Sequence, residues 1–425
     1  MRKLLIILLN ILWMLFATSC KKNDTVVNNQ NKELGPGQRP PAAPQQLKAT
    51  AVSEIEIDLA WKDTSGYITG FKIERYDPVV GWVILDSTFG YTTSYQDNNV
   101  RCNTGYYYRV AAYNPVGFSP FSNLATATAL ADDILLQPAA SINNLNSVFF
   151  TTHDHGFAAG DKGTILRTTD GGISWDTVSS GTLKNLRGIS FSGLSSGMAV
   201  GDGGTVLQTT DGGGTWHPLS LATPPPTIPM WAVSSASPSV WVIVGGSSST
   251  IFRTTDGGGH WTKPVSGTLS VLRAVSFLNL NLGTIVGASG TILSTSNGGA
   301  SWGRQAIGLT STSLYGVAFS DSVSETVVGA NGLILRTTDL GSTWFVQPSN
   351  TSSTLYSVFY VDRLVGIAVG SNGAILQTTT GGKLWANQLG SVMNSLSGVY
   401  YNSSTNATAV GAAGTVASIA TCTGP

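Results

Sequence analysis

Thr168-Thr169-Asp170-Gly171-Gly172-Ile173-Ser174-Trp175 is an octapeptide that recurs through the C-terminal part of this 425-residue chain. It returns nearly intact at 209–216 and at 337–344. Weaker copies end at Trp261, Trp302 and Trp385, so that the six tryptophans stand 41, 45, 41, 42 and 41 residues apart. A regular period of about this length is typical of repeat architectures, in which each repeat is one supersecondary unit.

Each repeat contains three further strand-like segments before the octapeptide. In the first repeat they are Val148-Phe149-Phe150, a run that ends at Gly160, and Thr164-Ile165-Leu166-Arg167, and the tryptophan then opens a fourth strand. Four short strands per repeat, without a 3.6-residue apolar period, predict the blades of a β-propeller. The seventh repeat ends after three strands, and counting 41 residues back from Trp175 places Ile134 at the missing fourth position. We therefore expect an all-β, seven-bladed propeller over 131–425, in which 134–136 pair with the last strands and close the ring.

The first residues have the pattern of a targeting segment. Two basic residues, an apolar run at 4–16 and small residues before Cys20 predict a signal peptide over 1–19. Cys20 after small residues resembles the lipobox of bacterial lipoproteins, which implies a lipid on its thiol and a place in the bacterial cell envelope, at the outer membrane or cell surface. An ordinary secreted protein cleaved nearby is the alternative. Residues 20–41 are poor in apolar side chains and predict a flexible tether.

Residues 42–130 form a separate region with strand-like alternation. Apolar and polar residues alternate at 57–61, 71–76 and 106–112, which is typical of a β-sandwich with one buried face per sheet. The region resembles a fibronectin type III domain, and the resemblance implies an immunoglobulin-like sandwich. Because this fold by itself implies no function, we expect the domain to act as a spacer. The residues that carry it include Leu59, Trp61, Phe71, Tyr106, Tyr108, Arg109, Val110 and Asn114.

The octapeptide also fits the pattern Ser/Thr-x-Asp-x-Gly-x-Ser/Thr-Trp and so resembles the Asp box of bacterial neuraminidase repeats. The carboxylate can accept N–H bonds across its own turn, glycine permits a positive φ, and tryptophan buries a large ring between blades. Asn297 and Thr380 replace the aspartate in two copies and His260 replaces the hydroxyl residue in another, which favours a structural role. The residues assigned to this role are Asp170, Trp175, Asp211, Trp216, Asp256, Trp261, Asp339 and Trp344.

The whole repeat has a longer signature, Val-Gly-x-x-Gly-Thr-Ile-Leu-x-Thr-Thr-Asp-Gly-Gly-x-Ser-Trp, that recurs from 142 to 417. This signature resembles the photosystem II assembly/stability factor family. The resemblance implies a seven-bladed propeller that acts as a non-enzymatic assembly factor. The lipobox and the fibronectin-like region depart from the pattern of that family.

Charge and acidic residues narrow the classes of function. Charged residues are 11% of the chain and the formal net charge is zero, so no basic field is present and nucleic acid is not an expected partner. Glycosidases need paired carboxylates, whereas Glu325 is the one glutamate from Ile134 onward and its strand position predicts a surface residue. The His-Asp-His sequence at 153–155 lacks a further metal ligand nearby and predicts an exposed turn. We expect no catalytic residue, no cofactor and no metal.

Strand direction predicts where a ligand would bind. Successive strands of a blade alternate in direction, so the turns between strands 2 and 3 share one face with the start of strand 1, opposite the Asp boxes. Asp161 and Asp202 lie in such turns. We therefore expect a protein-binding scaffold with a protein or glycan ligand at this face, and membrane attachment through the lipid; the alternatives are strand-end capping and a carbohydrate-binding or sialidase-like propeller. The first residues of the innermost strands lie at the channel mouth and differ between repeats: Asn146, Arg187, Trp231, Arg273, Tyr315, Tyr356 and Ser397. The two arginines and three aromatic residues among them, Arg187, Trp231, Arg273, Tyr315 and Tyr356, predict a binding ring.

Overall fold

The computed structural model describes residues 39–53, 56–77, 80–100, 104–129, 134–138, 140–221, 227–246, 249–305, 311–388 and 392–420. The predicted signal peptide, Cys20 and most of the predicted tether lie outside these residues. The described residues form β-strands and single 3₁₀ turns, so the prediction of an all-β chain is confirmed. Over the same residues, no helix has the length and apolarity needed to cross a membrane.

The N-terminal region contains two antiparallel sheets, with strand orders β1-β2-β5 and β4-β3-β6-β7, and β8 pairs with β6. Trp61 of β2 packs edge-on against Phe71 of β3 with ring centres 5.3 Å apart, and the buried Tyr108 of β6 donates its hydroxyl to Asp97 of β5. These contacts join the two sheets and confirm the sandwich. Its strands are β1 (Gln45–Ala51), β2 (Ile57–Lys62), β3 (Gly70–Asp77), β4 (Gly81–Phe89), β5 (Ser94–Asp97), β6 (Gly105–Asn114), β7 (Gly117–Phe118) and β8 (Ala125–Thr128).

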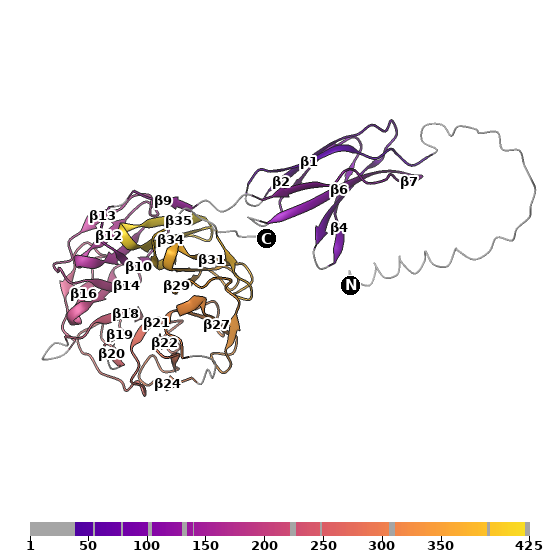
Figure 1. Ribbon diagram of the computed structural model, residues 1–425. Helices are drawn as coiled ribbons and strands as arrows, with labels where there is room; N and C mark the ends of the chain where they lie inside the picture. The colour runs from indigo at the N-terminus through magenta and orange to yellow at the C-terminus, as the bar shows by residue number, and fades with distance from the viewer. Residues whose placement is uncertain are drawn as a thin grey trace, which may run out of the picture. The chain divides into compact units, whose positions relative to one another are not determined.

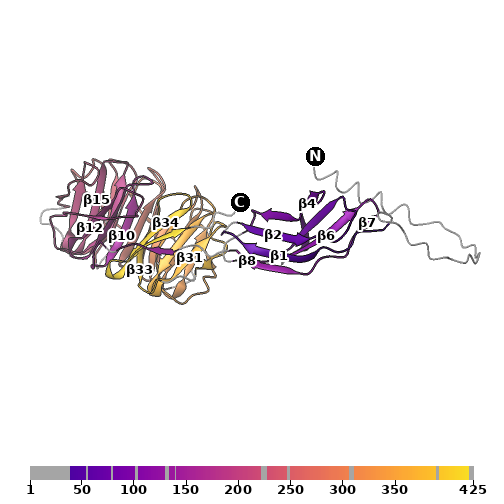
Figure 2. The same cartoon turned by 90° about the horizontal axis from the view of Figure 1, so that it is seen from above.

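The remaining strands form a β-propeller, which confirms the predicted architecture (Figure 1). The described residues contain seven sheets of this propeller, called blades 1 to 7 in chain order. Blade 1 consists of β10, β11, β12 and β13, and blade 7 consists of β33, β34, β35 and β9. Each innermost strand contacts the innermost strand of the next blade, and β33 contacts β10, so the sheets form a closed ring. The strands of each blade run side by side through the depth of the ring (Figure 2).

The four strand positions of the blades have these bounds. The innermost strands are β10 (Leu145–Phe150), β14 (Leu186–Ser192), β18 (Met230–Ser235), β21 (Leu272–Phe277), β25 (Leu314–Phe319), β29 (Leu355–Tyr360) and β33 (Leu396–Tyr401). The second strands are β11 (Gly156–Gly160), β15 (Ser196–Gly201), β19 (Trp241–Gly245), β22 (Gly283–Gly287), β26 (Glu325–Gly329), β30 (Gly366–Gly370) and β34 (Asn406–Gly411). The third strands are β12 (Ile165–Thr168), β16 (Val206–Thr209), β20 (Thr250–Thr254), β23 (Thr291–Thr295), β27 (Ile334–Thr337), β31 (Ile375–Thr378) and β35 (Val416–Ala420). The outer strands are β13 (Asp176–Val178), β17 (His217–Pro218), β24 (Gly303–Arg304), β28 (Phe345–Gln347), β32 (Ala386–Asn387) and β9 (Ile134–Leu136).

Two features of the outer and connecting segments complete the blades. In blade 3 an isolated bridge between Arg253 and Thr262 stands where the other blades have an outer strand. Short 3₁₀ turns join the second and third strands of five blades: η1 (Asp161–Gly163), η2 (Asp202–Gly204), η3 (Ala330–Gly332), η4 (Ser371–Gly373) and η5 (Ala412–Gly414).

The ring closes between the first and last strands of the propeller. β9 pairs antiparallel with β35, with Ile134 opposite Ile419 and Leu136 opposite Ala417. Ile134 therefore lies in the outer strand of blade 7, as the count of 41 residues back from Trp175 predicts. Pairing covers the edge that β35 would otherwise present to solvent, where unpaired backbone groups invite association with other chains.

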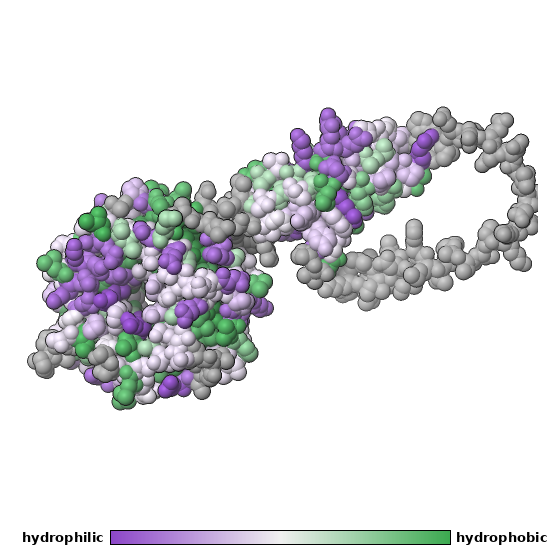
Figure 3. Space-filling view, viewed as in Figure 1, coloured by the Kyte–Doolittle hydropathy of each residue, from purple (hydrophilic) through white to green (hydrophobic). Residues whose placement is uncertain are grey.

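The hydrophobic core lies between blades. One cluster combines Phe157 and Ile165 of blade 1 with Leu186 and Trp216 of blade 2. Further clusters join each remaining pair of neighbouring blades, including blades 7 and 1. The second strands are buried along almost their whole length because a neighbouring blade covers each of their two faces. The outer surface is different: hydrophilic and hydrophobic residues are interspersed on the propeller face seen in Figure 3, as is usual for a folded surface.

Candidate functional site

The first Asp box is a closed hydrogen-bonded turn between β12 and β13. Asp170 Oδ1 accepts bonds from the Thr168 hydroxyl at 2.8 Å and the Ser174 N–H at 2.9 Å, and Oδ2 accepts the Ser174 hydroxyl. These bonds, first of all that from the Ser174 side chain, lower the pKa of Asp170 to about 2 because they favour the charged carboxylate. Trp175 donates its indole N–H to the Gly172 carbonyl at 3.0 Å and is buried against Phe150.

The altered Asp boxes keep the same turn with different atoms. Asn297 accepts the Thr295 hydroxyl and the Ser301 N–H through Oδ1, as the aspartate does in the first box. His260 places Nδ1 2.6 Å from Asp256 Oδ2, where the other boxes have a hydroxyl. The partners of the Asn297 and Asp256 side chains lie within the box itself, so these side chains act as a local staple.

The Asp boxes and the channel mouth lie on opposite faces of the propeller. The first box is next to the turn between strands 1 and 2, because the Gly171 N–H bonds to the Asp154 carbonyl at 3.0 Å. The turns between strands 2 and 3 lie instead beside the start of the innermost strands: Asp161 accepts from Asn146 at 3.0 Å, and Asp202 accepts from Arg187. This is the arrangement expected from the alternation of strand directions.

A β-bulge occurs at the same place in every innermost strand. In blade 2, Leu186 pairs with Gly201 and Gly188 with Val200, which leaves Arg187 as the extra residue. The other blades have the same shift, and the extra residues are Asn146, Arg187, Trp231, Arg273, Tyr315, Tyr356 and Ser397. Bulges re-aim side chains and are frequent beside functional sites. The seven residues predicted at the mouth are thus the seven bulge residues.

Six of these seven side chains line one cavity at the channel mouth, with a volume of about 200 Å³. They include the five predicted binding residues, Arg187, Trp231, Arg273, Tyr315 and Tyr356. Among the described residues that line it, none carries a carboxylate. The seventh bulge residue, Asn146, is instead engaged with Asp161 and with the Leu186 carbonyl.

Arg187, Trp231 and Arg273 form a stack inside this cavity. The guanidinium carbons of the two arginines lie 4.2 and 4.1 Å from the centre of the Trp231 ring, so both arginines stack on this one ring. Cation–π contacts of this kind contribute about 0.5–2 kcal/mol each. The guanidinium carbon of Arg273 also lies 6.0 Å from the centre of the Tyr315 ring. The Tyr315 and Tyr356 rings pack edge-on, with their centres 5.6 Å apart.

The two arginines differ in charge balance. Arg187 is bidentate to Asp202, at 2.5 and 2.9 Å, so its charge is neutralised within the chain. The corresponding turn of blade 4 begins with Ala288 in place of an aspartate. The Nε of Arg273 is buried without a hydrogen-bond partner among the described residues. Loss of solvent lowers the pKa of Arg273, Arg187 lowers it further, and Tyr315 opposes both effects. Arg273 is therefore a partly desolvated cation that can donate hydrogen bonds to an anionic or carbonyl group of a ligand.

The prediction that Glu325 is a surface residue is wrong. Its exposed fraction is 2%, because second strands are covered by neighbouring blades on both faces. Burial raises the pKa of Glu325 to about 7. Comparison of the repeats at this position, where blades 1, 2, 4 and 6 have glycine, would have identified the glutamate as an exception.

The residues considered for a metal site do not gather further ligands. His153 and Asp154 contact each other at 2.6 Å in an exposed turn. Over the described part of the chain, no group of three or more His, Cys, Asp or Glu side chains is placed to hold a metal ion.

Repeated four-stranded blades, a closed ring and a lined central channel define a repeat β-propeller, here preceded by a fibronectin type III domain. The family model of that domain matches residues 42–128. The chain belongs to the family of the photosynthesis system II assembly factor YCF48, whose model matches residues 136–276 and 267–416.

Solved structures agree with this fold. The structure of YCF48 bound to D1 peptide is 20% identical, with a TM-score of 0.58 over 68% of this chain and 95% of that one. YCF48 from Cyanidioschyzon merolae is 21% identical, with a TM-score of 0.57 over 68% of this chain and 98% of that one. A streptogramin B lyase is 10% identical, with a TM-score of 0.55 over 68% and 97% of the two chains. At these identities the likeness concerns the fold alone.

A curated protein also matches a short part of the chain. It is an alpha-amylase of Niallia circulans, 35% identical over 99 residues, which are 23% of this chain and 7% of the amylase. The chain thus spans less than a tenth of the length of the curated relative that it matches.

Proposed function

We propose that the propeller is a non-enzymatic scaffold that binds a polypeptide at the channel mouth. The observation that carries this proposal is the Arg187–Trp231–Arg273 stack, in which Arg273 has no carboxylate partner among the described residues of the cavity. Tryptophan, tyrosine and arginine are the residues most often found at the energetic centres of protein interfaces. Membership of a family of assembly factors supports the same role, as does the solved relative that holds a peptide.

The binding proposal is tested by capture of peptides on the soluble form that begins at Lys21. An immobilised library of unstructured peptides and a glycan array are probed with the wild type and with Arg273→Ala. We expect peptide binding that weakens at least about tenfold in the variant, the loss usual for a buried charged contact. Arg304→Ala, an exposed arginine on β24, is the matched control and should bind like the wild type. Equal peptide binding by wild type and Arg273→Ala, or binding only to glycans, would refute the proposal.

We also propose that Cys20 carries a lipid that holds the chain at the bacterial cell envelope. The support is the sequence before Cys20, since basic, apolar and small residues follow one another in the order of a lipoprotein signal. In a bacterial host, the wild type should incorporate an alkyne-labelled fatty acid and sediment with membranes. Cys20→Ala should do neither, and a labelled, sedimenting variant would contradict the anchor.

A further inference from the structure

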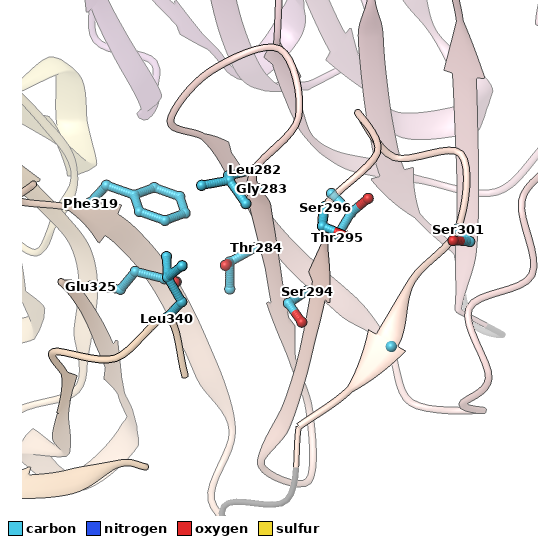
Figure 4. A pocket seen from close by; sticks show the side chains of 11 residues that line it. Leu282, Gly283, Thr284, Ser294, Thr295, Ser296, Ser301, Phe319, Glu325 and Leu340 are labelled. Carbon is cyan, nitrogen blue, oxygen red and sulfur yellow. The ribbon is translucent and has the colours of Figure 1, made fainter. Parts of the chain in front are cut away.

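A second cavity, distinct from the channel mouth, lies between blades 4 and 5 on the Asp-box face. Its volume is about 340 Å³. One wall is formed by Phe319, Glu325 and Leu340 of blade 5, and Thr284 and Ser294 of blade 4 form the other (Figure 4). Ser296, Ser301 and Gly303 at its margin are exposed, so the cavity is open to solvent.

Glu325 supplies the one charge among the described residues that line this cavity. Its side chain is almost completely buried, and its Oε2 has no hydrogen-bond partner in the part of the chain that the structure describes. A buried carboxylate without a counter-charge is costly, and such groups are normally paired. The cavity therefore presents an acid without a counter-charge to any ligand that enters it.

The neighbouring clefts show how the cleft between blades 4 and 5 differs at its third-strand position. In the cleft of blades 3 and 4, Arg253 of the third strand crosses to donate its Nε–H to the Gly298 carbonyl of the next Asp box, at 2.7 Å. Arg336 donates in the same way to Gly381 between blades 5 and 6. Gln208 makes the equivalent bond between blades 2 and 3. In blade 4 this position is Ser294, which is too short to reach the next blade.

The carbonyl equivalent to Gly298 and Gly381 belongs to Leu340, which is itself exceptional. Leu340 has a φ of +55°, whereas the same position in the other five boxes is a glycine with positive φ. A bulky residue in the left-handed region costs about 1–2 kcal/mol, and such strain is often kept at binding sites. Gln305 occupies one acceptor site of the Leu340 carbonyl, at 3.1 Å, and a carbonyl oxygen has two.

We propose that this cavity binds the guanidinium group of an arginine side chain from a polypeptide partner. The guanidinium would take the place that Arg253 and Arg336 fill in neighbouring clefts, donating to the Leu340 carbonyl and pairing with Glu325. The planar group suits a carboxylate bidentately, and Phe319 offers an aromatic face for cation–π contact. Three departures from the repeat, at 294, 325 and 340, meet at this one cleft, and each serves such a ligand.

The test uses the soluble form that begins at Lys21 and the probe Nα-acetyl-L-arginine methylamide. The citrulline analogue, which has the same shape without the charge, is the control ligand. Binding is followed by ligand-observed NMR up to concentrations on the order of 10 mM, as suits a single side chain. We expect saturable binding of the arginine probe, and at least about tenfold weaker binding of the citrulline probe. Equal binding of both probes, or no saturable binding, overturns the proposal.

Two variants locate the bound probe. Glu325→Gln should weaken it about tenfold or more, while Asp154→Asn, the same chemical change at an exposed turn of the same face, should leave it unchanged. Ser294→Arg should occupy the cleft from within the chain, abolish probe binding and raise Tm. If Glu325→Gln does not fold, Ser294→Arg decides alone, and undiminished binding to it refutes the site. Peptide capture at the channel mouth is independent of all these outcomes.

Discussion

Replacing Glu325 by glutamine should make the stability of the protein less sensitive to pH. The glutamine has nearly the same shape but cannot ionise, so the substitution removes one titration from a cleft where Glu325 is almost fully buried. Burial raises the pKa of Glu325 from its ordinary 4.5 to about 7, and a hydrogen bond from Thr284 opposes the shift only in part. The folded state thus holds this proton more tightly than the unfolded state does.

The sign and size of the effect follow from this difference. Below pH 4.5 the carboxyl is protonated in both states and its contribution to stability is fully present. As the pH rises from 4.5 through about 7, the unfolded state loses its proton first and the folded state is destabilised relative to it. At about 1.4 kcal/mol for each pH unit, the wild type loses on the order of 3 kcal/mol that the glutamine variant keeps.

The assay is urea denaturation of both proteins at a series of pH values between 4 and 9. Other titrating groups are common to the two proteins, so the difference between their free energies of unfolding isolates Glu325. We expect this difference to grow in favour of Glu325→Gln between pH 4.5 and about 7 and then to level off. A difference that does not change with pH, or that shrinks as the pH rises, would show that Glu325 is solvated or paired and would refute the reasoning.

Two further outcomes test the packing and the staples. Gly156→Ala should lower the free energy of unfolding, measured in urea, by about 1–3 kcal/mol, because the new Cβ would lie 2.6 Å from the Phe150 ring. Gly303→Ala, at an open position of β24, is the control, and an equal loss of stability in both variants would contradict the packing argument. Asp211→Ala should lower Tm in a thermal melt, whereas the Tm of Asp211→Asn should stay close to that of the wild type, since Asn297 already makes the same turn in its own box. An equal fall of Tm in both variants would show that the negative charge is essential.

The fold was predictable because the sequences of the repeats can be compared with one another. A single copy of the octapeptide would carry little weight, but six tryptophans at nearly constant spacing fix the period, and the period alone locates Ile134 in the closing strand. The position of the mouth residues followed from strand direction, which requires no knowledge of side-chain packing. The domain boundaries at 41 and 130 stay predictions.

The details of the mouth were not predictable in the same way. The bulge that isolates Arg187 and Arg273 is a backbone irregularity, and the pattern of apolar residues contains no sign of it. The stacking of both arginines on Trp231 depends on three blades at once. The sequence misplaces Glu325 because an acidic residue in a strand usually faces solvent, whereas the second strand of a blade has no solvent-facing side.

The pairing of β9 with β35 has a consequence for the order of events during synthesis. β9 leaves the ribosome some 280 residues before its partner, and until then blade 7 does not exist to receive it. Such long-range pairing is slow and leaves strand edges uncovered while the chain grows. The growing chain therefore carries an open arc of blades. The uncovered strand edges at its two ends can pair with neighbouring chains as well as with one another. Completion of the ring is the step that converts this association-prone intermediate into a monomeric unit in which these edges are paired.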